Sequence, residues 1–172
     1  MIGFLTVAVV AAAAIFVVNR LTGRGNESGT VKGPSGNPFT FERPSGWKEL
    51  SRTELDGLPG SPLVVLRRKD GRGILIVNEQ ARTSHDFAKI SSDLDTALPK
   101  SVPDFKKVTS HTIGVKAGQA FLYSYTRTKK GTAHSVVVVP SASGGYTINA
   151  VVAGGADLVA RQVGTMIRSF DA

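Results

Sequence analysis

Residues 119–152 read QAFLYSYTRTKKGTAHSVVVVPSASGGYTINAVV, and this stretch decides the fold. Its β-branched and aromatic runs are separated by the turn-forming sequences Thr128–Gly131 and Pro140–Gly145. Such runs, joined by short connections that contain Gly, are typical of consecutive antiparallel strands. In the middle run, Val136–Val139 is apolar on both faces. This pattern predicts a central strand that is covered on both sides of a sheet.

A second hairpin and a helix precede this meander. The apolar runs Leu63–Arg68 and Gly73–Glu79 flank Asp70–Gly71, and Asp-Gly between two such runs is a strong hairpin signal. Thr83–Asp86 then offers a capping box for a helix, which we expect Pro99 to end. The apolar stripe of this helix, with spacings of three and four, consists of Phe87, Ile90, Leu94 and Leu98.

The remaining elements lie at the two ends of the domain and after the helix. Phe39–Phe41 alternates as a short strand, and Pro44 places it at an edge or a strand end because proline has no N–H to donate. Phe105–Val115 indicates a further strand, and a C-terminal helix follows Gly154–Gly155. Its apolar stripe consists of Val159, Val163, Met166 and Phe170. We therefore predict an α+β fold with a mainly antiparallel sheet of about six or seven strands flanked by helices.

The N-terminal segment is the strongest signal for location. Residues 2–18 carry no charge, and at about 1.5 Å per residue they would form a helix of roughly 25 Å, the short end of a bilayer span. We interpret residues 1–21 as one transmembrane anchor. A cleaved signal peptide is the alternative, since Ala11–Ala14 offers a cleavage site. Arg20 and Arg24 follow the segment, and by the positive-inside rule they favour the cytoplasmic face for the domain.

Residues 22–38 follow the predicted anchor and consist mainly of Gly, Ser, Pro and Asn, with a single aliphatic side chain. Such a composition buries too little apolar surface to offset the entropy lost on ordering. We predict a flexible linker over 22–38 and one folded domain over 39–172.

The order of these elements resembles the PsbP/Mog1/LpqN-like superfamily. The sequences that carry the resemblance are Phe41, Pro44–Trp47, Phe105–Val108, Gly118–Thr126 and Met166–Phe170. The resemblance covers nearly all of residues 39–172 and implies an α/β/α sandwich. It also implies a non-enzymatic accessory or binding protein, as in photosystem assembly, nuclear transport or mycobacterial envelope lipid traffic. Exported bacterial members are often membrane-anchored, and on this ground we place the domain on the extracytoplasmic side of the plasma membrane.

The residues themselves carry no catalytic pattern. The absence of cysteine excludes disulfides, thiolate metal sites and thiol catalysis. His85, His111 and His134 lack the spacing of metal ligands, and there is no Gly-x-Ser-x-Gly sequence. We therefore predict no enzymatic activity, no cofactor and no metal site, with a hydrolase of unrecognised type as the alternative.

Two candidate binding features remain. The formal net charge is +8, and basic residues gather at two predicted hairpin turns, where they would form one positive patch if both turns lie at one edge of the sheet. These residues are Arg67, Arg68, Lys69, Arg72, Arg127, Lys129 and Lys130. Anionic lipid is their candidate partner, simple solvation is the alternative, and nucleic acid is disfavoured because no aromatic residues interleave with them. Trp47, the only tryptophan, is predicted to pack in the core or to stack on a ligand.

Together these observations predict a membrane-anchored, non-catalytic accessory or binding domain of the cell envelope. Its expected partner is another envelope protein or a lipid-like ligand. A cytoplasmic-face domain that uses its basic turns on anionic lipid is a further alternative.

Overall fold

The computed structural model describes residues 27–56, 58–81, 83–141 and 144–172. The predicted anchor at 1–21 lies outside these residues. Among the residues described, no helix combines the length and the apolar character needed to cross a membrane.

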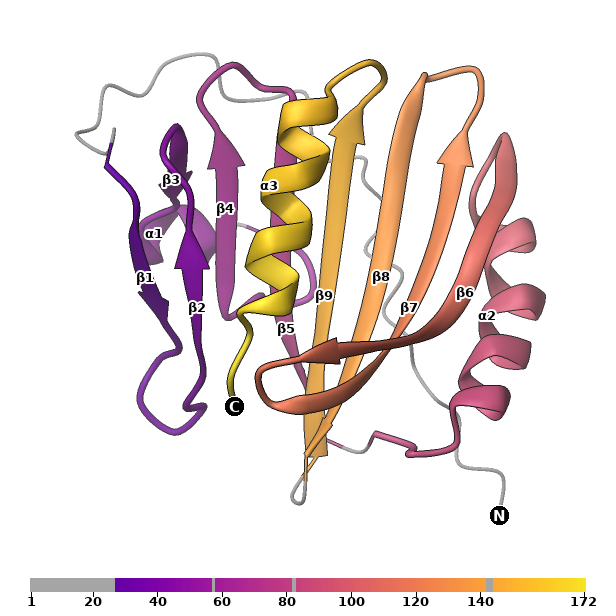
Figure 1. The fold of residues 1–172 in the computed structure, drawn as a ribbon, viewed down its shortest axis with the longest axis horizontal. Coiled ribbons are helices and arrows are strands. Elements are labelled where there is room, and N and C mark those ends of the chain that lie inside the picture. Colours follow the sequence, from indigo (N-terminus) through magenta and orange to yellow (C-terminus); the bar gives the residue numbers. More distant parts are fainter. Residues whose placement is uncertain (1–26, 57, 82, 142–143) are drawn as a thin grey trace.

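Seven antiparallel strands form the main sheet, in the order β3-β4-β5-β9-β8-β7-β6 (Figure 1). Hairpins join β4 to β5 and β6 through β9 in succession, as the alternating runs and Gly-containing turns predicted. The strand bounds are β3 Trp47–Glu49, β4 Val64–Arg68, β5 Gly73–Gln80, β6 Phe105–Val115, β7 Gly118–Arg127, β8 Thr132–Ser141 and β9 Gly144–Ala153. The predicted α+β class is confirmed.

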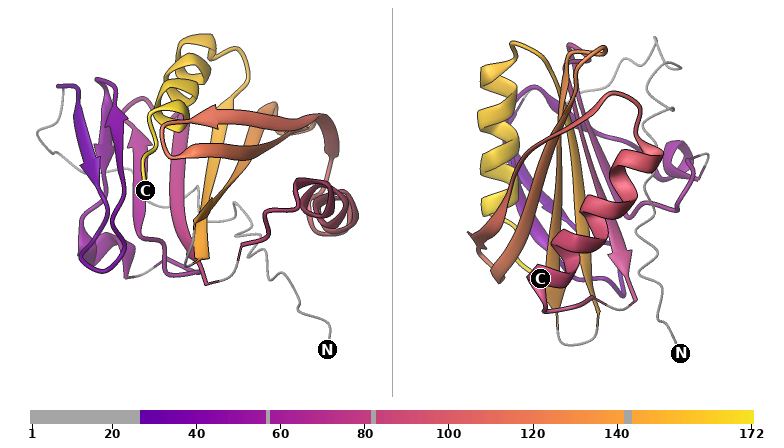
Figure 2. Two further views of the ribbon diagram at one scale, coloured as in Figure 1. Left: turned by 60° about the horizontal axis from the view of Figure 1, so that its bottom comes forward. Right: turned by 90° about the vertical axis from the view of Figure 1, so that its right-hand side faces the viewer.

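The two long helices cover opposite faces of the sheet (Figure 2). Helix α3 spans Asp157–Arg168, and α2 spans Phe87–Ser101. At the start of α2, the Asp86 side chain accepts a hydrogen bond from the backbone N–H of Lys89 at 3.0 Å, which satisfies one of the free amides of the first turn. A one-turn helix, α1, spans Arg52–Leu55 and was not predicted.

The prediction that Pro99 ends α2 is wrong, because the helix continues to Ser101. Pro99 lies in the last turn, where a missing N–H removes only one helical hydrogen bond. The N–H of Val102, just past the helix, bonds to the Leu98 carbonyl at 2.8 Å and closes the helix.

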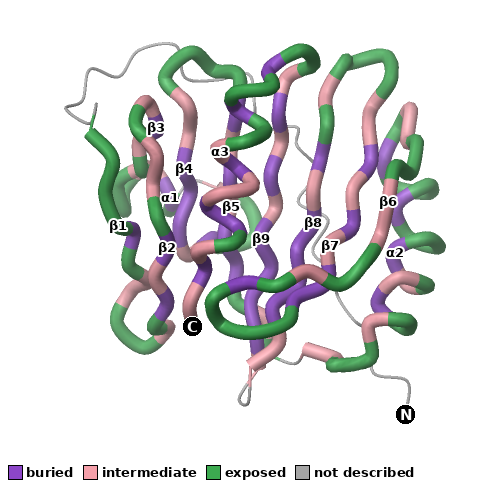
Figure 3. Tube along the Cα trace, in the orientation of Figure 1, coloured by how far each residue is buried: buried purple, intermediate pink, exposed green. Residues whose placement is uncertain are grey.

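Each face of the sheet has its own apolar core. Val137 and Val139 of β8 belong to the core under α3, whereas Val136 and Val138 belong to the core under α2. All four are buried, and β8 pairs with a strand on each side. The prediction of a central strand covered on both faces is therefore confirmed, and Figure 3 shows how burial follows the middle strands while the turns stay exposed.

Part of the predicted linker is folded. Gly29–Lys32 forms strand β1, which pairs with β2 at Thr40–Arg43 in a separate two-stranded sheet. Val31 lies opposite Phe41 and is only 2% exposed. This one aliphatic side chain enters the apolar core, and burial of its apolar surface stabilises a segment whose composition otherwise favours disorder. The folded unit therefore begins before residue 39, and the predicted first strand lies outside the main sheet.

Candidate functional site: the basic end of the sheet

The strand register brings both basic turns to the same end of the sheet. Gly73 at the start of β5 lies opposite Val152 of β9. The next residue of β9, Ala153, lies opposite Thr132 of β8, which in turn lies opposite Arg127 of β7. The β4–β5 turn (69–72) and the β7–β8 turn (128–131) therefore share one end, which we call the basic end (Figure 1).

The β9–α3 loop lies between these two turns and bonds to both. The N–H of Ala153 donates to the Arg72 carbonyl at 3.0 Å, and the N–H of Gly154 donates to the Gly131 carbonyl at 2.6 Å. A Cβ at Gly154 would lie 2.7 Å from that Gly131 oxygen, so only glycine fits without a shift of the backbone. These contacts fix the spacing between the two basic turns.

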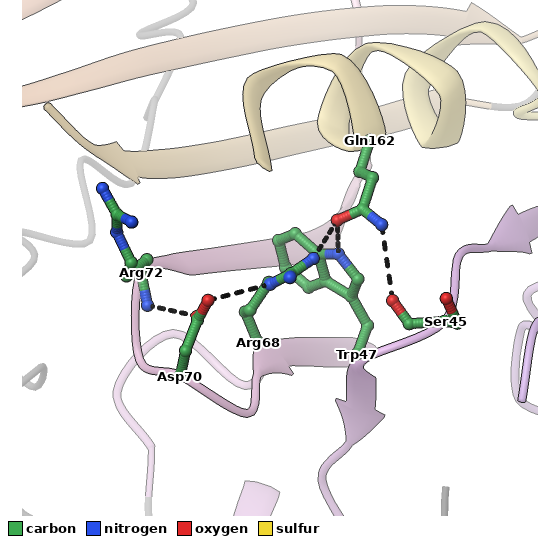
Figure 4. Close-up of polar contacts among 6 residues, drawn as sticks. All are labelled: Ser45, Trp47, Arg68, Asp70, Arg72 and Gln162. Atoms are coloured by element: carbon green, nitrogen blue, oxygen red, sulfur yellow. Dashed lines mark hydrogen bonds and ion pairs between the residues drawn. The ribbon is translucent and has the colours of Figure 1, made fainter. Parts of the chain in front are cut away.

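Arg68 points inward from the basic end and serves the fold. Its Nη1 donates to the Oε1 of Gln162 on α3, and the same Oε1 accepts from the Trp47 Nε1 at 3.1 Å (Figure 4). The amide nitrogen of Gln162 donates to the Ser45 carbonyl at 3.4 Å. This network ties α3 to β3, to β4 and to the turn before β3, which makes Arg68 a structural residue.

Asp70 orders the β4–β5 turn from within. Its carboxylate accepts from the Arg68 Nε at 3.2 Å and from the Arg72 backbone N–H at 3.0 Å. Burial alone would raise the pKa of the Asp70 carboxyl, but the hydrogen bonds from Arg72 and Arg68 outweigh it and hold the pKa below its usual value. The carboxylate thus offsets the charge of Arg68, while Arg72 itself is an exposed residue.

The β7–β8 turn is bound to the connection between α2 and β6. The Arg127 Nε donates to the Pro103 carbonyl at 3.1 Å, and the Thr128 N–H donates to the Asp104 carbonyl at 3.2 Å. Lys129 forms an ion pair with Asp104 at 3.6 Å, yet its side chain stays 84% exposed. Its ammonium group therefore remains open to a partner in solution.

The other three predicted contact residues also lie at this end. Lys69 and Lys130 are exposed in the two turns, whereas Arg67 is partly buried on β4 opposite Ile74. All three take part in interactions within the protein. The structure thus brings the seven predicted residues to one end of the sheet, with Arg68 turned away from the surface.

Trp47 is fully buried in strand β3 and packs against the core under α3. A Cβ at Gly73 would lie 2.7 Å from the Cη2 of Trp47, so β5, the second strand from β3 in the sheet, needs a glycine to pass this ring. The indole therefore has no face open to a ligand. Of the two predicted roles of Trp47, packing in the core is the one that fits its position.

Two of the three histidines bond to threonine. His111 Nδ1 lies 3.2 Å from the Thr109 hydroxyl, and His134 Nε2 lies 2.9 Å from the Thr132 hydroxyl. Burial, with a smaller effect from the charge of Arg127, lowers the pKa of His134 to about 4, so its imidazole is neutral at pH 7. In the described part of the chain, no three His, Cys, Asp or Glu side chains gather closely enough to hold a metal ion.

Sequence reasoning missed Gln162 and Asp104. Gln162 comes three residues after Val159 on α3 and so flanks the apolar stripe, a position from which a polar side chain can reach a buried partner. Asp104 lies between a helix and a strand and has a positive φ of 59°. The sequence does not indicate this backbone conformation. The position of Gln162 at the border of the stripe was the available signal.

No protein-family model and no curated protein sequence matches the chain. Among solved structures, cyanobacterial PsbP (CyanoP) from Synechocystis sp. PCC 6803 is similar, with a TM-score of 0.61 and 16% identity over 90% of this chain and 98% of that chain. LpqN, described as involved in cell envelope biogenesis of Mycobacterium tuberculosis, has a TM-score of 0.56 and 14% identity over 85% and 91%. The chain therefore has the PsbP/Mog1/LpqN-like fold that its sequence predicted.

Proposed function

We propose that the protein is a non-catalytic accessory or binding domain of the cell envelope, held to the plasma membrane by an anchor over residues 1–21, with its domain on the extracytoplasmic side. The observation that carries this proposal is the likeness of the whole fold to LpqN, a protein involved in cell envelope biogenesis. The uncharged N-terminal segment supports the membrane attachment.

The chemistry of the α2 face supports a non-catalytic role. Lys107 Nζ donates to both oxygens of Asp95 at 2.8 Å, and the Tyr123 hydroxyl donates to the same carboxylate at 2.6 Å. The bonds from Lys107 and Tyr123 lower the pKa of Asp95, while burial and this same carboxylate raise the pKa of Tyr123. Asp95 therefore stays ionised and Tyr123 stays protonated, and in these states they hold α2 to β6 and β7. A general acid or base would instead need a pKa close to the working pH.

The expected partner is another envelope protein or a lipid-like ligand. A domain of this kind binds partners through its surface, and the basic end gathers seven basic residues in and beside two neighbouring turns. Its exposed cations select for anionic partners at a membrane or on a neighbouring protein.

The test is to express the full chain in bacteria, extract membranes with alkaline carbonate, and treat intact cells with protease. We expect the chain to stay in the carbonate-resistant fraction and to be digested before lysis. A variant with Val9→Arg and Ala13→Arg is the control, since two charges inside the segment oppose insertion. Release of the unaltered chain by carbonate would overturn the anchor, and protection from protease until lysis would overturn the extracytoplasmic placement.

A further inference from the structure

The described chain begins at the basic end. Gly29, the first residue of β1, lies opposite Arg43, the last residue of β2. The turn that follows Arg43 leads to Gly46, whose carbonyl accepts the N–H of Lys69 in the β4–β5 turn at 3.0 Å. Strand β1 therefore begins at the end of the sheet that carries the β4–β5 turn (Figure 1).

We propose that the basic end docks onto anionic phospholipid headgroups of the membrane that holds the anchor at residues 1–21. This proposal rests on the proposed anchoring and adds to it an orientation for the domain and a chemical class of ligand. The proximity of the start of β1 to the β4–β5 turn, at the basic end, carries it.

The length of the connection favours this end over the opposite one. Residues 22–28, which connect the predicted anchor to β1, can span at most about 25 Å, which is less than the length of the sheet. The strands between the two ends, such as the ten residues of β9, are about 33 Å long. An anchored chain therefore keeps the basic end beside the headgroups, whereas the β6–β7 turn (116–117) at the opposite end lies one sheet length further away.

The charges at the basic end suit an anionic surface. Arg72 and Lys129 are exposed, and Lys69 and Lys130 lie in the same two turns. Asp70, Asp104 and Asp157 are the acids in and beside the two turns, and Glu27 begins the described chain. The carboxylates of Asp70 and Asp104 pair with Arg68 and Lys129. Basic residues outnumber acidic ones here, so the field at this end attracts anionic headgroups.

The absence of cysteine allows a direct test with single labelled positions in the full chain. A fluorophore on Thr128→Cys reports the basic end, and one on Ala117→Cys reports the opposite end. Each protein is reconstituted in phosphatidylcholine vesicles, with and without phosphatidylglycerol, that carry a quencher on the headgroups. We expect phosphatidylglycerol to increase quenching at position 128 only. Raising the salt from about 0.1 M to 1 M should remove the increase, because the screening length falls from about 10 Å to about 3 Å.

Matched charge variants separate this docking from a general effect of net charge. Arg72→Gln with Lys129→Gln should lower the ratio of docked to undocked domain about fivefold per charge. Lys32→Gln with Lys89→Gln removes the same charge from exposed positions away from the basic end and should leave the ratio unchanged. Neither pair includes Arg68, Trp47 or Gln162, so the fold stays intact in both.

Quenching that is equal at positions 128 and 117, or that does not depend on phosphatidylglycerol, would overturn the docking while leaving the anchor in place. An equal effect of the two charge variants would overturn the assignment to the basic end. Loss of the chain from the vesicles would instead overturn the proposed anchoring, on which the docking rests. If the basic end serves an acidic envelope protein instead, the lipid composition will have no effect.

Discussion

The two basic turns have similar composition but different structural roles. Beside the β4–β5 turn, Arg68 at the end of β4 continues the inward positions of that strand and bonds to Gln162 on α3. In the β7–β8 turn, Lys129 lies beyond the last strand pair and keeps 84% of its side chain exposed. A basic residue on the inward face of a strand thus serves the fold, whereas one beyond the strand pair is exposed at the surface.

The largest expected effect concerns the core beside the β4–β5 turn. Trp47→Ala removes a fully buried indole and the hydrogen bond from its Nε1 to Gln162. We expect the free energy of unfolding to fall by about 3–5 kcal/mol. Urea unfolding of the full chain in mild detergent measures it. Val108→Ala, at a position that is 62% exposed, is the control and should cost less than about 0.5 kcal/mol. Similar costs for the two variants would contradict the structural assignment of Trp47.

The second effect separates the two arginines of one turn. Arg68→Ala leaves the Oε1 of Gln162 without its charged donor and Asp70 without its ion-pair partner. A loss of about 1–3 kcal/mol in unfolding free energy is expected. Arg72→Ala, whose backbone bond to Asp70 survives the change, should stay within about 0.5 kcal/mol. Equal losses would show that Arg68 acts as a surface charge like its neighbour.

The third effect is a pH dependence next to the β7–β8 turn. His134 stacks on Tyr125 with ring centroids 4.7 Å apart, and its pKa is lowered from 6.5 to about 4 in the folded protein. Between these pH values the unfolded chain binds more protons at this site, so stability falls as the pH decreases through this window. The loss attributable to His134 is on the order of 2 kcal/mol.

Unfolding free energies measured from pH 7 to pH 4 test this dependence. His134→Gln should flatten the decline, and His111→Gln is the control for removing a histidine at an exposed position. An unchanged decline in the His134 variant would mean that other groups cause the acid sensitivity.

The smallest effect is expected at Lys129. Its ion pair with Asp104 is long, at 3.6 Å, and solvent-exposed, so Lys129→Gln should change the unfolding free energy by less than about 0.5 kcal/mol. The same urea titration measures it. A loss as large as that of Arg68→Ala would remove the distinction between the two turns.

Strand positions could be predicted because alternation and turn residues act locally. Asp70–Gly71 marked the β4–β5 turn, and Val136–Val139 marked a strand covered on both faces. Strand β1 could not be predicted, because only Val31 in Gly29–Lys32 carries apolar surface and its partner, Phe41, lies ten residues further along the chain. The pairing depends on the tertiary core, which a local pattern does not contain.

The candidate site could be predicted in part. Turn residues between apolar runs identified the two hairpins and the basic residues beside them, and the sheet order of the structure placed both turns at one end. The inward direction of Arg68 could not be predicted, because it depends on Gln162, which lies 94 residues away in sequence. Contacts at such separation arise from the packing of α3 on the sheet.

Hydrogen exchange of the full chain in lipid nanodiscs tests the orientation of the domain most directly. The account predicts that replacing phosphatidylcholine by phosphatidylglycerol slows exchange in peptides that cover residues 69–72 and 128–131, while the turn at 116–117 is unchanged. Slower exchange at 116–117, or no difference between the two lipids at either end of the sheet, would contradict it.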